Sequence, residues 1–224
     1  MGSSQAVEDY LKTIFHLSHE LSSAASTSAI AARLGVAAPS VSAMLKRLES
    51  DQLVERGPGH AIALTPEGER RAMRVVRRHR LIESFLHLSL GMAWHEVHDE
   101  AEQLEHAISD RLEARIDAAL GYPTTDPHGD PIPPAELIDH VEAWPDPLSA
   151  AAVGERFRVE RVSDRNPAAL EYLAGLGIIP GAELDVIERL PFDGPLRVGL
   201  GGREQAIGGA LTSMVHGTSL GVRP

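Results

Sequence analysis

The chain has 224 residues, more than the ~100 to 150 of a typical domain, which predicts two or three domains. Its 43% hydrophobic and 24% charged residues exclude a wholly disordered chain, a collagen and a continuous coiled coil. Because no residue is cysteine, a metal would have to bind His, Asp, Glu or Met. No apolar run reaches the ~18 residues that span a bilayer and no export signal is recognisable, so we expect a cytoplasmic protein without a membrane partner.

The net charge of -11 is divided unevenly along the chain. Residues 1–80 hold 11 Lys and Arg against 8 Asp and Glu, whereas residues 81–224 hold 10 against 24. A mildly basic first part joined to a strongly acidic remainder is typical of a small DNA-binding module attached to a part that handles cations or other partners.

The first 64 residues predict three short helices followed by a hairpin. Apolar residues recur at helical spacing over 7–21 and 27–34, and Pro39 suits the first turn of a third helix that buries Val41, Leu45 and Leu48. Two extended runs, 53–56 and 61–64, flank a Gly-Pro-Gly-His loop. This order of elements predicts a winged helix-turn-helix domain over residues 1–73.

The third helix of this domain carries its polar side chains on the outward face. Hydroxyl and basic groups there can donate to phosphates while the helix enters the major groove of DNA, although the same residues could simply keep the surface soluble. The candidate DNA contacts are Thr27, Pro39, Ser40, Ser42, Lys46, Arg47 and, in the wing, Arg56.

A helical part and a β part are predicted beyond the wing. Thr65-Pro66 opens a long basic helix to about Leu88, and a further helix is expected from Trp94 to Leu120, which gives a helical domain over 74–143. Residues 122–147 hold seven of the 15 prolines and mark a boundary. The glycine-rich remainder, with short apolar runs and one helix from Pro167 to Leu176, predicts an SH3-like barrel over 148–224. The fold class is thus mainly α with a small all-β domain.

Histidines and carboxylates gather between residues 79 and 106. His79 and Glu83 are separated by one helical turn, and a step of 100° per residue places four more such side chains on one face of the predicted helix: His98, Glu102, Glu105 and His106. Metal sites in helical bundles are built from inward His and Glu residues of this kind. The alternative is a solvated helix face, because His and Glu are common exposed residues.

Several strings resemble the diphtheria-toxin-repressor family of metal-activated transcriptional repressors. They are VEDYLKTI from Val7, RHRLIE from Arg78, VHDEA from Val97, LEH from Leu104 and DPHGDPIP from Asp126. The resemblance is close over residues 7–134 and mainly architectural afterwards. It implies a winged helix-turn-helix, a helical dimerisation and metal-binding domain, and a C-terminal SH3-like domain.

The resemblance also implies two metal ions per subunit. The primary site would use Asp9, Glu102, Glu105 and His106, and the second would use His79, Glu83 and His98, completed by Asp164 of the SH3-like domain. Iron-responsive members have Met and Cys where this chain has Asp9 and Glu102, so the expected metal is manganese, with ferrous iron second. The remaining histidines, including His128, are interpreted as surface or satisfied core residues.

These observations predict a homodimeric, metal-activated repressor that binds double-stranded operator DNA and controls genes of metal-ion homeostasis, and not an enzyme. One alternative is a winged-helix regulator that responds to an organic ligand or to pH through its histidines. Another is a binuclear metallohydrolase, but no phosphate-binding loop or nucleophile motif accompanies the expected ligands.

Overall fold

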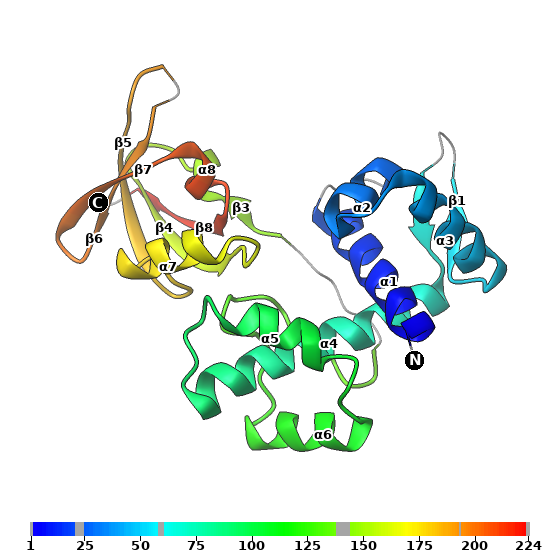
Figure 1. Ribbon diagram of the computed structural model, residues 1–224. Helices are drawn as coiled ribbons and strands as arrows, with labels where there is room; N and C mark the ends of the chain where they lie inside the picture. The colour runs from blue at the N-terminus through cyan, green and yellow to red at the C-terminus, as the bar shows by residue number, and fades with distance from the viewer. Residues whose placement is uncertain (1, 21–24, 58–60, 138–143, 193, 223–224) are drawn as a thin grey trace.

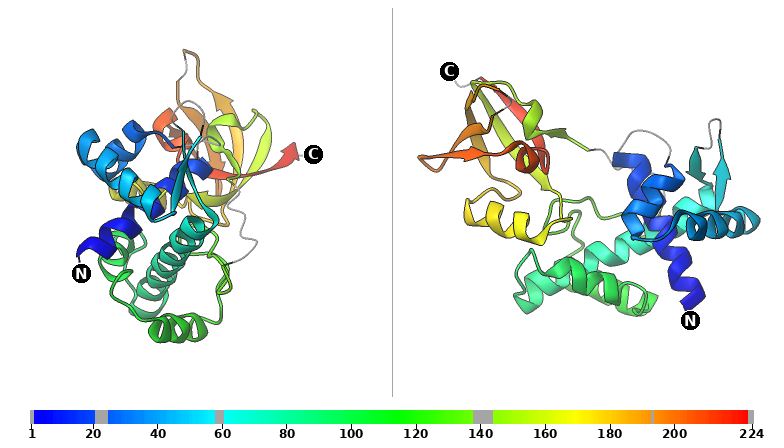
Figure 2. Two further views of the ribbon diagram at one scale, coloured as in Figure 1. Left: turned by 90° about the vertical axis from the view of Figure 1, so that its right-hand side faces the viewer. Right: turned by 45° about the horizontal axis from the view of Figure 1, so that its top comes forward.

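The computed structural model describes residues 2–20, 25–57, 61–137, 144–192 and 194–222. Figure 1 shows a helical part that lies below two others, an N-terminal part with a short hairpin and a C-terminal β part, and the views in Figure 2 agree. The three-part architecture predicted from the sequence is therefore confirmed. The loop residue His60 and also His140 lie outside the described residues.

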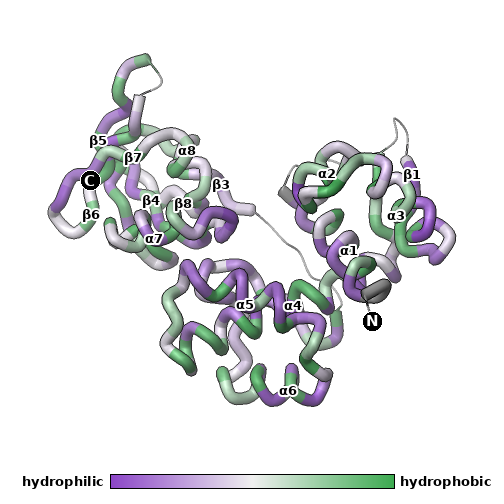
Figure 3. The backbone as a smooth tube through the Cα atoms, viewed as in Figure 1, coloured by the Kyte–Doolittle hydropathy of each residue, from purple (hydrophilic) through white to green (hydrophobic). Residues whose placement is uncertain are grey.

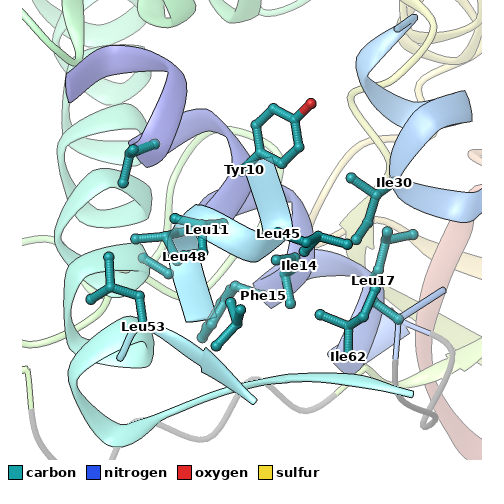
Figure 4. Packing of buried hydrophobic residues seen from close by; sticks show 14 of the residues in the cluster. Tyr10, Leu11, Ile14, Phe15, Leu17, Ile30, Leu45, Leu48, Leu53 and Ile62 are labelled. Atoms are coloured by element: carbon teal, nitrogen blue, oxygen red, sulfur yellow. The ribbon is translucent and has the colours of Figure 1, made fainter. Parts of the chain in front are cut away.

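The N-terminal part is a winged helix-turn-helix. It contains α1 (Gly2–Glu20), α2 (Thr27–Leu34), α3 (Ala38–Ser50), β1 (Val54–Arg56) and β2 (Ile62–Leu64), and the two strands pair antiparallel with Val54 opposite Leu64. Leu11, Ile14 and Phe15 of α1 pack against apolar residues of α2, α3 and the hairpin (Figure 4). Burial of this shared apolar face holds α2, α3 and the hairpin together and fixes α1 against them.

A single helix, α4 (Pro66–Leu90), leads from this part into the helical part. The Thr65 hydroxyl accepts a hydrogen bond from the backbone N–H of Gly68, and Gly91 ends the helix in a left-handed conformation. Hydrophilic and hydrophobic stretches alternate along α4 (Figure 3). The boundary expected between residues 73 and 74 falls inside this continuous helix, and the bounds 1–73, 74–143 and 148–224 stay predictions.

The single helix expected from Trp94 to Leu120 is wrong. The structure has α5 (Val97–Leu104) and α6 (Asp110–Ala119) instead. Ser109 adopts an extended backbone, and its hydroxyl accepts a hydrogen bond from the N–H of Leu112, so it starts a new helix. Glu105 and His106 therefore lie in the turn after α5 and do not continue the helix face that carries His98 and Glu102.

The C-terminal part is a six-stranded antiparallel sheet that wraps around one core. Its elements are β3 (Asp146–Pro147), the 3-10 turn η2 (Leu148–Ala150), β4 (Glu155–Val162), α7 (Pro167–Gly175), β5 (Glu183–Arg189), β6 (Leu196–Leu200), β7 (Arg203–Ile207), α8 (Gly209–Thr212) and β8 (Val215–Val222). The strand order is β3-β8-β4-β5-β6-β7. Phe157, Leu170 and Leu184 lie fully or almost fully buried in the core.

No single helix in the described ranges is both long and apolar enough to cross a membrane. Only α2 and α3 taken together meet the length and composition criteria, and they are bent by 112° at the turn between them.

The loop before the third part, residues 126–130, is fastened to β4. The backbone N–H of Val162 donates to the carbonyl of His128 at 2.9 Å, and a Cβ atom at Gly129 would lie 1.9 Å from the carbonyl oxygen of Glu160. Gly129 also has a φ of +88°, which L-residues rarely adopt. This close approach requires glycine and sets the β part against the helical part.

Replacing Gly129 by Ala should lower the thermal unfolding temperature and expose the 126–130 loop to protease, because both the backbone conformation and the contact with Glu160 are lost. The matched control is Gly154→Ala, which has a φ of +90° but no atom within 4 Å of the added Cβ. The control should lose only about 1 kcal/mol of folding free energy. Equal losses in the two variants would contradict a packing role for Gly129.

Candidate metal centre

Two clusters of possible metal ligands lie where α1, α4, α5 and the end of β4 meet. In each cluster, one ligand atom per residue lies within 4.8 Å of all the others. The first contains Asp9, Glu105 and His106, and the second contains His79, Glu83, His98 and Asp164. These two clusters contain seven of the eight residues that the sequence suggested, and the eighth, Glu102, lies in a separate group with His79 and Glu105.

His106 is the centre of the first cluster. Its Nε2 lies 2.8 Å from Oδ1 of Asp9 and 3.2 Å from Oε1 of Glu105, while its Nδ1 donates to Oε2 of Glu8 at 2.6 Å. With the Nδ1 hydrogen committed to Glu8, Nε2 is the nitrogen left for a metal ion. Glu8 thereby orients the imidazole, a role that the sequence analysis did not assign to it.

Glu102 does not lie in this cluster, although it was expected there. Lys12 of α1 lies between two carboxylates, with Nζ 2.6 Å from Oε1 of Glu102 and 2.6 Å from Oε1 of Glu105. The other neighbours of Oε1 of Glu102 are His98 Nε2 at 3.7 Å and His79 Nδ1 at 3.9 Å. The ammonium group of Lys12 is therefore the physical reason for the displaced position of Glu102.

The second cluster joins α4, α5 and the segment after β4. Nε2 of His79 lies 3.0 Å from Oε1 of Glu83 and 3.2 Å from Nδ1 of His98. Nδ1 of His98 lies 3.0 Å from Oδ2 of Asp164. The Nδ1 hydrogen of His79 goes to Oε2 of Glu105 at 2.6 Å, which leaves Nε2 facing the cluster.

In both clusters, neighbouring carboxylates stabilise the protonated, positively charged form of the histidines. Burial lowers the pKa of His79, but Glu83 and Glu105 outweigh it and raise the pKa to about 9. Burial likewise lowers the pKa of His98, yet Asp164 and Glu83 raise it to about 11. Hydrogen bonds to Asp9 and Glu105 raise the pKa of His106 to about 10. A metal ion would displace these protons, so its apparent affinity rises with pH up to these values.

The expected DNA contacts lie on one part of the molecule. Pro39, Ser40, Ser42, Lys46 and Arg47 are exposed on α3, Arg56 is exposed on β1, and Thr27 is half-buried at the start of α2. Arg56 pairs with Glu49, and the Ser42 hydroxyl donates to the carbonyl of Ala38 at 3.1 Å.

Comparison with known proteins assigns the three parts separately. Residues 3–61 match the iron dependent repressor N-terminal DNA binding domain, residues 65–134 match the iron dependent repressor metal binding and dimerisation domain, and residues 147–217 match the FeoA domain. Over 189 residues the chain is 36% identical to the diphtheria toxin repressor of Corynebacterium efficiens, which covers 80% of this chain and 82% of that protein. The chain belongs to the diphtheria-toxin-repressor family.

Some relatives of this chain are named for iron and others for manganese. The chain is 37% identical over 163 residues to the iron-dependent repressor IdeR of Mycobacterium leprae, covering 73% of this chain and 68% of that protein. A solved structure described as a manganese-dependent transcriptional repressor in complex with manganese superposes with a TM-score of 0.88 at 41% identity. It covers 96% of this chain and 100% of that one. The fold is therefore shared along almost the whole length of this repressor.

Replacing Lys12 by Met should strengthen metal binding by this repressor about tenfold or more, because a like charge next to the ligands is removed. The metal-free variant should lose about 3 kcal/mol of stability, since two carboxylates lose their buried partner. Isothermal titration and thermal unfolding measure the two effects, and Lys46→Met on the exposed face of α3 is the control. Unchanged or weaker metal binding in Lys12→Met would show that the ammonium does not compete with the metal.

Proposed function

We propose that the chain is a metal-activated, homodimeric transcriptional repressor that binds operator DNA and controls genes of metal-ion homeostasis, acting in the cytoplasm. One observation carries the proposal: the two clusters join α1 of the DNA-binding part, α4 and α5 of the helical part and Asp164 of the barrel. Family membership supports both the DNA-binding and the dimerisation role.

Two metal ions per subunit are supported by the chemistry of the ligands. His106 Nε2 lies 2.8 Å from Oδ1 of Asp9 and 3.2 Å from Oε1 of Glu105, so a metal ion that replaced its proton would have two carboxylate oxygens beside it. The primary site is Asp9, Glu105 and His106, with Glu102 released from Lys12 as a further ligand. The second site is His79, Glu83, His98 and Asp164.

Manganese fits these ligands better than the softer metals do. Asp9, Glu102 and Glu105 offer carboxylate oxygens, which suit hard cations, whereas thiolate and thioether groups suit softer ones. Raw affinity does not favour manganese, because zinc and copper bind such groups more tightly, so selectivity has to come from geometry. Ferrous iron is the second metal of this proposal, and the named relatives include proteins of both kinds.

Activation follows from the position of Asp9 on the first helix. Asp9, Glu105 and His106 would hold the ion, which would supply fixed bonds and positive charge between the two carboxylates. With the ion bound, Asp9 would hold α1 against Glu105 and His106, and α1 would in turn hold α2 and α3 through the apolar contacts of Leu11 and Ile14. The restrained α3 helices of a dimer enter successive major grooves, ~34 to 36 Å apart, with less entropy lost on binding.

The exposed face of α3 and the wing form the proposed DNA interface. Lys46, Arg47 and Arg56 would neutralise phosphates, whereas Ser40 and Ser42 lie closer to the bases, with Pro39 and Thr27 at the edges. Proton sensing is the weaker alternative, because the pKa values of His79, His98 and His106 lie near 9, 11 and 10, far above neutrality.

Specific DNA binding should require a divalent metal. An operator selected from random duplexes in the presence of Mn²⁺ is titrated by fluorescence anisotropy with Mn²⁺, Fe²⁺, Zn²⁺ or chelator. Mn²⁺ should activate best, and Glu105→Gln should raise the Mn²⁺ concentration for half-activation at least about tenfold, because one side chain serves both clusters.

The control for this experiment is Glu100→Gln, which removes the same charge from an exposed position on α5 and should leave activation unchanged. Full operator affinity in chelator would refute metal activation. Equal behaviour of the two variants would refute the assignment of Glu105.

A further inference from the structure

The first half of α4 carries a concentration of arginines that the proposed DNA interface does not use. Six of the 11 Lys and Arg residues among the first 80 positions lie on this helix. Two of them, Arg77 and Arg80, are buried and donate to backbone carbonyls. The other four, called the α4 stripe below, line a surface hollow of about 350 Å³: Arg70, Arg71, Arg74 and Arg78. Steps of four residues from Arg70 to Arg78 make this stripe about 12 Å long.

Acidic neighbours neutralise the α4 stripe only in part. Glu67 pairs with both Arg70 and Arg71, yet these two side chains stay 53% and 55% exposed. Arg74 is exposed and forms no ion pair or hydrogen bond within the described ranges. Glu8 also lines the hollow, but its carboxylate accepts a hydrogen bond from an imidazole of the metal centre. Three exposed arginines therefore share a single exposed carboxylate.

The start of α4 is joined closely to the end of α3. The backbone N–H of Thr65 donates to the carbonyl of Leu53 at 3.1 Å, and the Thr65 hydroxyl donates to the carbonyl of Gln52 at 2.7 Å. A Cβ atom at Gly68 would lie 1.9 Å from the carbonyl oxygen of Leu53, so the helix packs directly on the residues that follow α3. Figure 1 shows this end of α4 beside α1. The α4 stripe thus belongs to the same rigid unit as the recognition helix.

We propose that the α4 stripe binds the phosphate backbone of DNA, in addition to the contacts of α3 and the wing. The planar guanidinium group matches phosphate oxygens, and the exposed ion pairs with Glu67 cost little to exchange for them. DNA fits this surface better than an acidic protein does, because the stripe is carried by the DNA-binding unit itself. Since residues 81–224 are strongly acidic, a polyanion is attracted to the few places where basic charge gathers. This inference rests on the DNA binding of the proposed function.

The contribution of the α4 stripe does not depend on the metal centre. Backbone contacts at Leu53 hold the start of α4 against the DNA-binding unit, whereas the proposed ions act where Asp9 meets the turn after α5. Phosphate contacts carry no sequence information by themselves. The stripe should therefore strengthen binding to every DNA sequence by a similar factor, with and without metal.

The test measures how salt affects DNA binding by the full-length protein, using the selected operator in Mn²⁺ and a random duplex in chelator. Arg70→Gln, Arg71→Gln and Arg74→Gln are combined in one variant, and Arg74→Gln is also made alone. Each arginine that neutralises one phosphate should reduce the slope of log K against log salt by about 0.9 per subunit. The affinity lost with each phosphate should be about eightfold at 0.1 M salt and should vanish toward 1 M.

The matched control replaces Arg156, Arg158 and Arg203 of the barrel by Gln. It removes the same charge, and there too two of the arginines pair with one carboxylate, that of Glu183, while the third is exposed. The control should keep the wild-type slope on both DNAs. Any general effect of net charge on DNA binding is thereby separated from a contact of the α4 stripe.

Ethylation of single phosphates locates the contact on the operator. Ethylation should weaken the wild type at phosphates where it has no effect on Arg74→Gln. Equal slopes in the triple variant and the control, or identical ethylation patterns, would overturn the proposal. A triple variant that dissociates into monomers with an unchanged slope would also overturn it, because the stripe would then bind a second copy of the chain. A wild type that binds no operator with any metal would instead refute the proposed function.

Discussion

The side chain of Glu105 is almost fully buried between the two clusters, and its two oxygen atoms face different ones. Oε1 contacts Lys12 and His106, whereas Oε2 accepts the hydrogen of His79. A carboxylate buried in this way is stable only while positive charge surrounds it, and these neighbours hold its pKa well below the usual range despite its burial. Because the neighbours come from α1 and α4, the charge of one residue determines how two domains fit together.

Lys12 supplies part of the positive charge that Glu105 needs when no metal ion is bound. Its ammonium group lies against both Glu102 and Glu105, and their charges raise its pKa although burial alone would lower it. The same residue connects α1 to α5, as a metal ion bound to Asp9 and Glu105 would. In the proposed activation, a metal ion would therefore replace the Lys12 ammonium group as the cation that joins the two domains, and its bonds would be stronger and fixed in geometry.

Local patterns predicted much of this structure, and tertiary contacts account for what they missed. The winged helix-turn-helix follows from apolar periodicity and turn residues, and the approach of His79 to Glu83 follows from their helical spacing. The break between α5 and α6 was missed because an N-cap at Ser109 was read as part of an uninterrupted helix. The roles of Glu8 and Lys12 depend on contacts with residues 98 and 90 positions further along the chain, which spacing cannot reveal, although Glu8 adjoins Asp9 in sequence.

The central claim is that metal restrains the DNA-binding part against the helical part. Because the chain has no cysteine, Ala32→Cys in α2 and Ala118→Cys in α6 can carry a donor and an acceptor dye at two exposed positions. Single-molecule energy transfer, with labelled subunits diluted into unlabelled protein, measures the distribution of distances between them. The account predicts a narrow distribution with Mn²⁺ and a broad one in chelator, and a broad one at both conditions when Glu105 is replaced by Gln. Distributions that are identical with and without metal would contradict it.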